Sequence, residues 1–147
     1  MARYRVYLDN CCFNRPYDNQ SQPLVRMETE AKLLIQQEIL NKKLELIWSF
    51  ILHYENSVNP YIDRRNQIRF WETEAADFVV FDNDIFLKAA EIMSFNVKEK
   101  DAYHIACSLR ANADCFITTD KKLLNKNINE ISILSPLDFL RRYYSEN

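Results

Sequence analysis

Acidic residues interrupt or end the apolar patterns of this chain at four places: Asp9, Glu55, Asp101 and Asp120. Asp9 closes the apolar run at 6–8, and Asp120 follows the apolar run at 115–118 just before a predicted helix. Open α/β sheets bind ligands beyond the carboxyl ends of their strands, so we expect these two carboxylates at one sheet edge. Carboxylates are the ligands that hard divalent cations prefer, and the four acids together predict one metal site.

Glu55 and Asp101 lie on helices that are predicted from apolar spacing. Ile51, Glu55 and Val58 fall at i, i+4 and i+7 of the helix expected over 49–58, which places Glu55 on the apolar stripe. A lone inward carboxylate is unfavourable unless it is paired or bound to metal. Asp101 stands in the first turn of the helix expected over 99–111, from where its side chain would reach toward the sheet edge.

Each acid also has a purely structural interpretation. Asp101 and Asp120 fit the role of helix N-cap or first-turn acid, which free backbone N–H groups and the helix dipole favour. Asp9 fits an Asx turn, and Glu55 fits a partner for a buried Arg or Lys. The metal-site hypothesis depends on the conjunction of the four acids, because independent accidents would not follow one topological plan.

Composition predicts one folded domain over residues 1–147. The chain is 48% hydrophobic and 13% aromatic, which argues against disorder, and its formal net charge of -2 excludes a globally basic nucleic-acid binder. We expect a cytoplasmic protein with no membrane segment, since no apolar run approaches the length of a membrane span. The four cysteines show no Cys-x-x-Cys spacing, so we expect them reduced, with Cys107 and Cys115 in the core and Cys11 and Cys12 near the site.

Local basic residues near the predicted site are candidates for contact with phosphate. Lys121 directly follows Asp120, and Arg15 lies in the stretch after Asp9. Both would bring positive charge beside a carboxylate cluster, as a nucleic-acid backbone requires. Most basic pairs in a sequence are simply solvated helix surface, so this signal by itself is weak.

Strand and helix patterns alternate along the chain. Strands are expected at 5–8, 44–48, 78–81, 115–118 and 131–134. Helices are expected at 24–40, with Met27, Ala31, Leu34 and Ile35 on one face, and at 49–58, 61–75, 82–94, 99–111, from 121 and from 136. Ser135 is expected to cap the last helix, and residues 10–23 read as turn-rich. This alternation predicts an α/β fold, a three-layer α/β/α sandwich around a mostly parallel sheet of about five strands.

Four segments, in order, resemble the motifs of the PIN domain family. They are Val6-Tyr7-Leu8-Asp9-Asn10, Glu55 in the helix after the second strand, Lys100-Asp101-Ala102-Tyr103-His104-Ile105-Ala106, and Phe116-Ile117-Thr118-Thr119-Asp120. The family includes the VapC-type toxin nucleases of bacterial VapBC toxin-antitoxin pairs. The resemblance covers essentially the whole chain, and it agrees with the fold that the alternation of elements predicts.

The resemblance implies a metal-dependent endoribonuclease that uses Mg²⁺ or Mn²⁺ and hydrolyses RNA phosphodiester bonds. Its catalytic and metal-binding acids would be Asp9, Glu55, Asp101 and Asp120, with Glu55 either on the metal or positioning the attacking water. Thr118 matches the hydroxyl that often accompanies the last acid, and Asn10 would assist beside the first. The expected substrate contacts are Asn10, Arg15, Thr118 and Lys121. The resemblance further implies a small antitoxin partner and a homodimer.

Two departures and several alternatives stand beside this hypothesis. The sequence has no glycine, and Asn112 occupies a position where relatives often have one; Asn tolerates the left-handed conformation. The segment after Asp9 lacks the small hydroxyl residue that many relatives have. A response-regulator receiver would need an acidic pair where Asp9-Asn10 stands, and a haloacid dehalogenase phosphatase would need an acid at Cys11. A non-catalytic PIN-like module that binds RNA or protein is the main alternative.

Overall fold

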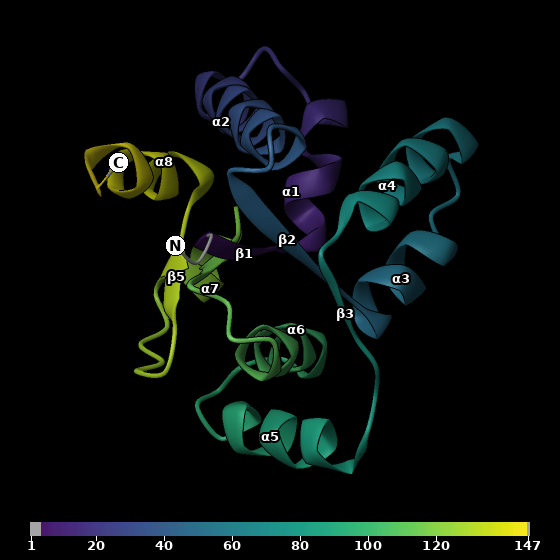
Figure 1. The fold of residues 1–147 in the computed structure, drawn as a ribbon, viewed down its shortest axis with the longest axis vertical. Helices are drawn as coiled ribbons and strands as arrows, with labels where there is room; N and C mark the ends of the chain where they lie inside the picture. Colours follow the sequence, from purple (N-terminus) through teal and green to yellow (C-terminus); the bar gives the residue numbers. More distant parts are fainter. Residues whose placement is uncertain (1–3, 147) are drawn as a thin grey trace.

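The computed structural model describes residues 4–146, which form one α/β unit (Figure 1). Its five strands are β1 (Tyr4–Leu8), β2 (Leu44–Ser49), β3 (Asp77–Val79), β4 (Cys115–Ile117) and β5 (Ser132–Leu134). Its helices are α1 (Asn10–Asn14), the 3₁₀ turn η1 (Arg15–Tyr17), α2 (Pro23–Leu40), α3 (Phe50–Ser57), α4 (Ile62–Glu74), α5 (Asn83–Met93), α6 (Glu99–Arg110), α7 (Lys121–Leu124) and α8 (Pro136–Glu146). The predicted alternation of strand and helix is confirmed.

The sheet is parallel at every strand pair, and its order is β3-β2-β1-β4-β5. The chain first builds outward from β1 to β3 and then returns to place β4 and β5 on the other side of β1. The order therefore reverses between β1 and β4, which makes that crevice the topological switch point where α/β folds bind ligands.

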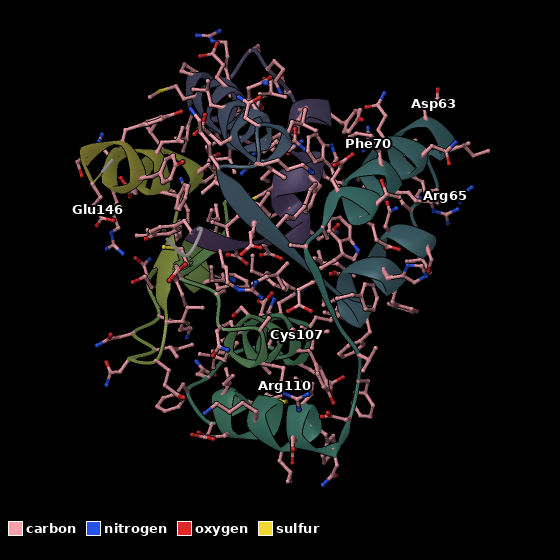
Figure 2. All side chains as sticks on the ribbon, in the orientation of Figure 1. Asp63, Arg65, Phe70, Cys107, Arg110 and Glu146 are labelled. Carbon is pink, nitrogen blue, oxygen red and sulfur yellow. The ribbon has the colours of Figure 1, made fainter. Side chains whose placement is uncertain are left out.

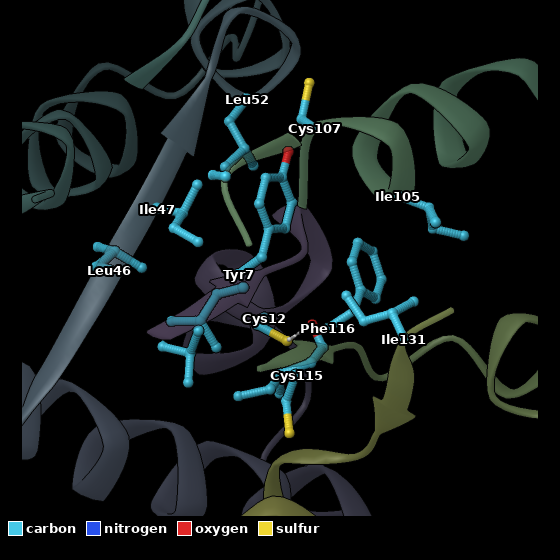
Figure 3. Packing of buried hydrophobic residues seen from close by; sticks show 14 of the residues in the cluster. Tyr7, Cys12, Leu46, Ile47, Leu52, Ile105, Cys107, Cys115, Phe116 and Ile131 are labelled. Atoms are coloured by element: carbon cyan, nitrogen blue, oxygen red, sulfur yellow. Dashed lines mark hydrogen bonds between the residues drawn. The ribbon is translucent and has the colours of Figure 1, made fainter. Parts of the chain in front are cut away.

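Helices cover both faces of the sheet, as a parallel sheet requires. Figure 1 shows α2 and α8 on one face and α5 and α6 on the other, with α3 and α4 beside β3. Strands β1 and β4 lie at the centre of this sandwich, and every residue from Val6 to Leu8 and from Cys115 to Ile117 is fully buried. Figure 3 shows Tyr7 and Phe116 at the middle of the apolar core. The three-layer prediction is confirmed.

The structure corrects the sequence prediction in three places. Residues 10–17 are helical where a turn-rich stretch was expected, because Asp9 accepts the Asn10 N–H as a cap and Pro16 lies at the start of the following 3₁₀ turn, just after Arg15. On α2 the buried positions include the polar residues Glu28, Lys32 and Gln36, whereas Met27 and Leu34 are exposed. Val58 is also exposed, since α3 ends at Ser57.

Other local predictions are confirmed. Asn112 has a φ of 56°, the left-handed conformation that Asn tolerates. Ser135 Oγ accepts from the Asp138 N–H at 3.1 Å at the start of α8. All four cysteines are free, and Cys107 and Cys115 are buried in the core. None of the helices within residues 4–146 has both the length and the apolar character that a bilayer span requires.

Candidate metal centre

Asp9 lies at the switch point between β1 and β4. Its N–H donates to the Ile117 carbonyl at 2.9 Å, which continues the ladder one residue beyond the Leu8 and Ile117 pair. Its Oδ1 accepts from the Asn10 N–H and its Oδ2 from the Thr118 hydroxyl, each at 2.8 Å. The carboxylate is almost fully buried and held at both oxygens, so its position is fixed by the sheet and by Thr118.

Asp120 is joined to Asp9 through the same threonine. The Asp120 N–H donates to Thr118 Oγ1 at 3.1 Å, while Asp120 Oδ1 caps α7 by accepting from the Lys122 N–H at 2.9 Å. The capping interpretation of Asp120 is therefore confirmed. It does not compete with a role at the site, because the cap uses only one carboxylate oxygen and Thr118 connects the two acids.

Asp101 enters the same region from the first turn of α6. It makes no capping hydrogen bond within the described chain, and the N-cap of that helix is Lys98. Burial raises the pKa of Asp101, and the nearby carboxylates Asp9, Asp120 and Glu55 raise it further, while His104 opposes them. The other three acids thus all act electrostatically on Asp101, as charges gathered in one region do.

Glu55 reaches this region from α3 and is bonded to a residue that the sequence analysis did not single out. His104 Nε2 lies 2.5 Å from Glu55 Oε1 and 3.8 Å from Asp9 Oδ1. Burial works to lower the pKa of His104, but the hydrogen bond to Glu55 and the charges of Asp9, Glu55 and Asp101 outweigh it, so the pKa is raised. The structural interpretation paired Glu55 with a buried Arg or Lys. Glu55 does pair with a buried basic side chain, but that side chain is His104.

His104 is the residue that sequence reasoning missed, whereas the expected position of Cys11 near the site is confirmed. His104 lies one helical turn after Asp101, so its spacing within the Asp-Ala-x-His motif was the available signal. Cys11 was expected only near the site, and its Sγ lies 3.5 Å from Asp9 Oδ2 and 3.4 Å from Thr118 Oγ1. It thus contacts both Asp9 and Thr118.

The predicted substrate contacts differ in how far their side chains are already engaged by other residues. Arg15 is engaged elsewhere, since its guanidinium pairs with Asp18 at 3.0 Å and with Glu28 at 3.2 Å. Asn10 Oδ1 accepts from Asn14 Nδ2 at 3.3 Å. Lys121 is exposed at the start of α7 and lies close enough to Glu28 to oppose the rise that burial causes in the pKa of Glu28.

A pocket of about 450 Å³ opens beside Asp101 and Asp120. Its other lining residues are Asn96, Val97, Lys98, Lys122, Leu123, Asn125 and Lys126. Three lysines therefore surround the space next to two of the acids. Such a space suits a ligand with negative charge and a polar surface better than an apolar one.

The donor set fits a hard divalent cation. Asp9, Glu55 and Asp101 act electrostatically on the one buried imidazole, His104, and Asp120 acts on Asp101. Negative charge is therefore in excess, and a cation would neutralise it. Among residues 4–146, no three His, Cys, Asp or Glu side chains lie close enough together to hold an ion jointly as they stand. Mg²⁺ commonly uses only one or two carboxylates and keeps several waters, so this arrangement remains compatible with it.

Comparisons with known proteins agree with this fold. A family model described as the PIN domain matches residues 6–128. A toxin-antitoxin complex from Klebsiella pneumoniae is similar in structure, with a TM-score of 0.60 and 12% identity over 89% of this chain and 97% of that one. VapBC2 from Rickettsia felis, bound to a DNA fragment from its promoter, has a TM-score of 0.59 and 12% identity over 88% and 96%. No curated protein matches the sequence.

Proposed function

The chain belongs to the PIN domain family, and from this premise we propose that it is a Mg²⁺- or Mn²⁺-dependent endoribonuclease of the VapC type. PIN domains are typically nucleases, and the structural neighbours are toxin-antitoxin complexes. The observation that carries the proposal is the grouping of Asp9, Glu55, Asp101 and Asp120 around the switch point between β1 and β4.

In the proposed mechanism, Asp9, Asp101 and Asp120 would hold the metal, one or two of them as direct ligands and the rest through bound waters. The metal would lower the pKa of a bound water and offset the charge that develops on the scissile phosphate. Glu55 accepts one proton of the attacking water as the water oxygen bonds to phosphorus. The bond from phosphorus to the leaving ribose oxygen breaks, and that oxygen takes a proton from solvent. Thr118 keeps Asp9 oriented through its hydroxyl at 2.8 Å.

Substrate binding is proposed to use the lysine-lined pocket together with the residues near Asp9. Lys98, Lys122 and Lys126 would contact phosphates next to the scissile one, since they line the same pocket as Asp101 and Asp120. Lys121 and Asn10, which directly follow Asp120 and Asp9 in the sequence, remain proposed substrate contacts. Arg15 shares its charge between Asp18 and Glu28, so we assign less of the phosphate binding to it.

Cleavage of RNA by the purified protein tests this function. Wild type should cut tRNA or unstructured RNA when Mn²⁺ is added and not when it is chelated. Asp9→Asn should lower the rate by at least about 100-fold, equivalent to about 2.7 kcal/mol of transition-state stabilisation. Asp63→Asn is the matched control, because Figure 2 shows Asp63 at the outer end of α4. Metal-independent cleavage, or no cleavage of any RNA, would count against the proposal and favour a binding module.

We propose a small antitoxin as partner and a second copy of the chain as a dimer mate. The support is that both structural neighbours come from toxin-antitoxin assemblies. Large apolar side chains such as Tyr54, Tyr61 and Phe81 are also exposed, as protein interfaces require. An antitoxin would appear as inhibition in the same cleavage assay, and a monomeric mass in solution would exclude the dimer.

A further inference from the structure

His104 is a buried histidine among the acids. It retains only 1% exposure, and its Nε2 bonds Glu55 Oε1 at 2.5 Å. The two residues come from different helices, α6 and α3, so the bond connects elements on either side of the site. Because α6 also carries Asp101, one helix delivers both an acid and the partner of another acid.

A hydrogen-bonded chain behind the imidazole fixes its orientation. Its Nδ1 bonds the Tyr7 hydroxyl at 2.6 Å, and that hydroxyl bonds Ser49 Oγ at 2.7 Å. Ser49 in turn caps α3 by accepting from the Leu52 N–H at 3.2 Å. The Tyr7 ring stacks on Phe116, and Figure 3 shows its hydroxyl pointing away from Phe116 toward α6.

The direction of the bond to Glu55 follows from chemistry. An ionised carboxylate only accepts, so Nε2 carries the hydrogen and donates it whether the imidazole is neutral or protonated. Nδ1 can then either accept from the Tyr7 hydroxyl or donate to its oxygen. A buried N–H is unfavourable without an acceptor, so the imidazole and Glu55 Oε1 hold each other in place.

The bond to His104 uses only one oxygen of the Glu55 carboxylate, so the other oxygen is available for a second role. The hydrogen bond to His104 uses Oε1, the side chain retains 18% exposure, and nothing else among residues 4–146 bonds this carboxylate. A carboxylate held by one oxygen has a defined orientation for the other. That is the requirement for a group that receives a proton from a positioned water.

We propose that His104 is a positioning residue that tethers Glu55 as the proton acceptor and leaves metal binding to Asp9, Asp101 and Asp120. The proposal rests on the ribonuclease function proposed above. Of the two roles that the resemblance left open for Glu55, metal ligand or base, it supports the base that the mechanism above uses. The histidine acts through Glu55 and does not touch the substrate.

Proton NMR of the metal-free protein tests the tether without any activity. Wild type should show one exchange-protected, downfield imidazole N–H resonance from His104. Glu55→Gln should move it upfield, because a neutral amide oxygen accepts a weaker bond than a carboxylate. The only other histidine, His53, is 51% exposed and paired with Glu72, so His53→Gln should leave the resonance unchanged. A resonance that does not respond to Glu55→Gln would overturn the tether.

A double-mutant cycle tests the positioning role. His104→Ala should lower kcat by about 10- to 100-fold with KM changed by less than about 3-fold, and His104→Gln should recover most of the loss because its amide can still donate to Glu55. Once Glu55 is Gln, removing His104 should change kcat little. Tyr7→Phe, which keeps the ring, should give a smaller loss if His104→Ala does not fold. His53→Gln is the control.

The outcomes separate this proposal from the proposed function. Failure of wild type to cleave RNA would overturn the function and this positioning role with it, while the NMR result would still decide the tether. Cleavage with additive losses for His104 and Glu55 would overturn the positioning role alone. Weaker Mn²⁺ binding in Glu55→Gln, measured by calorimetry, would also overturn it by making Glu55 a ligand.

Discussion

At the scale of single residues, three of the four acids of the candidate site are held by different parts of the fold. Asp9 depends on Thr118, Asp120 on the first turn of α7, and Glu55 on His104. Asp101 makes no hydrogen bond of its own within the described chain, and burial with like charges raises its pKa. It is therefore the acid whose ionised form is least stabilised by protein groups.

Mn²⁺ should stabilise wild type more than Asp101→Asn. The ion offsets the repulsion among the carboxylates, and a ligand at 100 times its Kd adds about 2.7 kcal/mol to the stability of the state that binds it. For a domain of this size that corresponds to roughly 5–10 °C in Tm. Differential scanning calorimetry with and without Mn²⁺ measures the shift. Equal shifts in wild type and Asp101→Asn would show that Asp101 is not at the metal site.

At the scale of elements, the helices α5 and α6 are joined by an ion pair remote from the site. Asp82 caps α5 by accepting from the Ile85 N–H at 2.9 Å, and Arg110 at the end of α6 bonds both Asp82 oxygens at 2.7 and 2.8 Å. Figure 2 shows Arg110 between the two helices. The Arg110 hydrogen bonds and the Ile85 N–H lower the pKa of Asp82 to about 2.

The pair predicts a pH dependence of stability. A carboxyl whose folded pKa is depressed stabilises the fold above its unfolded pKa, and this contribution is lost as pH falls toward the folded value. For Asp82 the window runs from 3.8 down to about 2. Asp82→Asn keeps a capping side chain, so it should be less stable than wild type at pH 7 and the gap should close between pH 4 and pH 2. Urea unfolding across this range measures it.

Asp84→Asn is the control for that experiment. Asp84 lies on the same helix but is 86% exposed and 4.0 Å from Arg110, so the gap to wild type should stay small and change little over this pH range. A difference between wild type and Asp82→Asn that does not vary with pH would rule out the ion pair as its source.

At the scale of the whole molecule, charge is arranged around the carboxyl edge of the sheet although the net charge is only -2. The acids lie at the switch point, and the lysines of the adjacent pocket lie beside Asp101 and Asp120. A nucleic-acid backbone could run through the lysine side while its scissile phosphate meets the carboxylates. Binding would then depend on salt through the lysines and on metal through the acids.

Removing a pocket lysine should weaken RNA binding without changing sequence preference. Lys122→Gln, placed in the Asp9→Asn background so that the RNA stays intact, should reduce the slope of log K against log salt by about 0.7, the value for one single-strand phosphate contact. Fluorescence anisotropy at several salt concentrations measures this slope. Lys42→Gln is the control, because Lys42 pairs with Glu74 near the start of β2, at the opposite end of the strands. If the two variants gave equal slopes, we would conclude that the pocket does not bind phosphate.

The sequence alone was enough for most of the fold. Short apolar runs, helical spacing, caps such as Ser135 and the order of strand and helix are local properties, so they predicted the elements and the parallel sheet. The inward face of α2 could not be predicted in this way. Its buried positions include Glu28, Lys32 and Gln36, and hydrophobicity does not reveal a polar side chain that buries its stem against neighbouring elements.

For the candidate site, too, the sequence determined some features and the tertiary structure decided others. The sequence by itself determined which acids follow which elements, because Asp9 and Asp120 must lie at strand ends once the strands are parallel. Only the tertiary structure decided what holds them. The partnership of His104 with Glu55 joins residues 49 positions apart, and the bond between Thr118 and Asp9 spans 109 positions. Neither hydrogen bond can be predicted from neighbouring residues in the sequence, since each exists only after the chain has brought distant elements together.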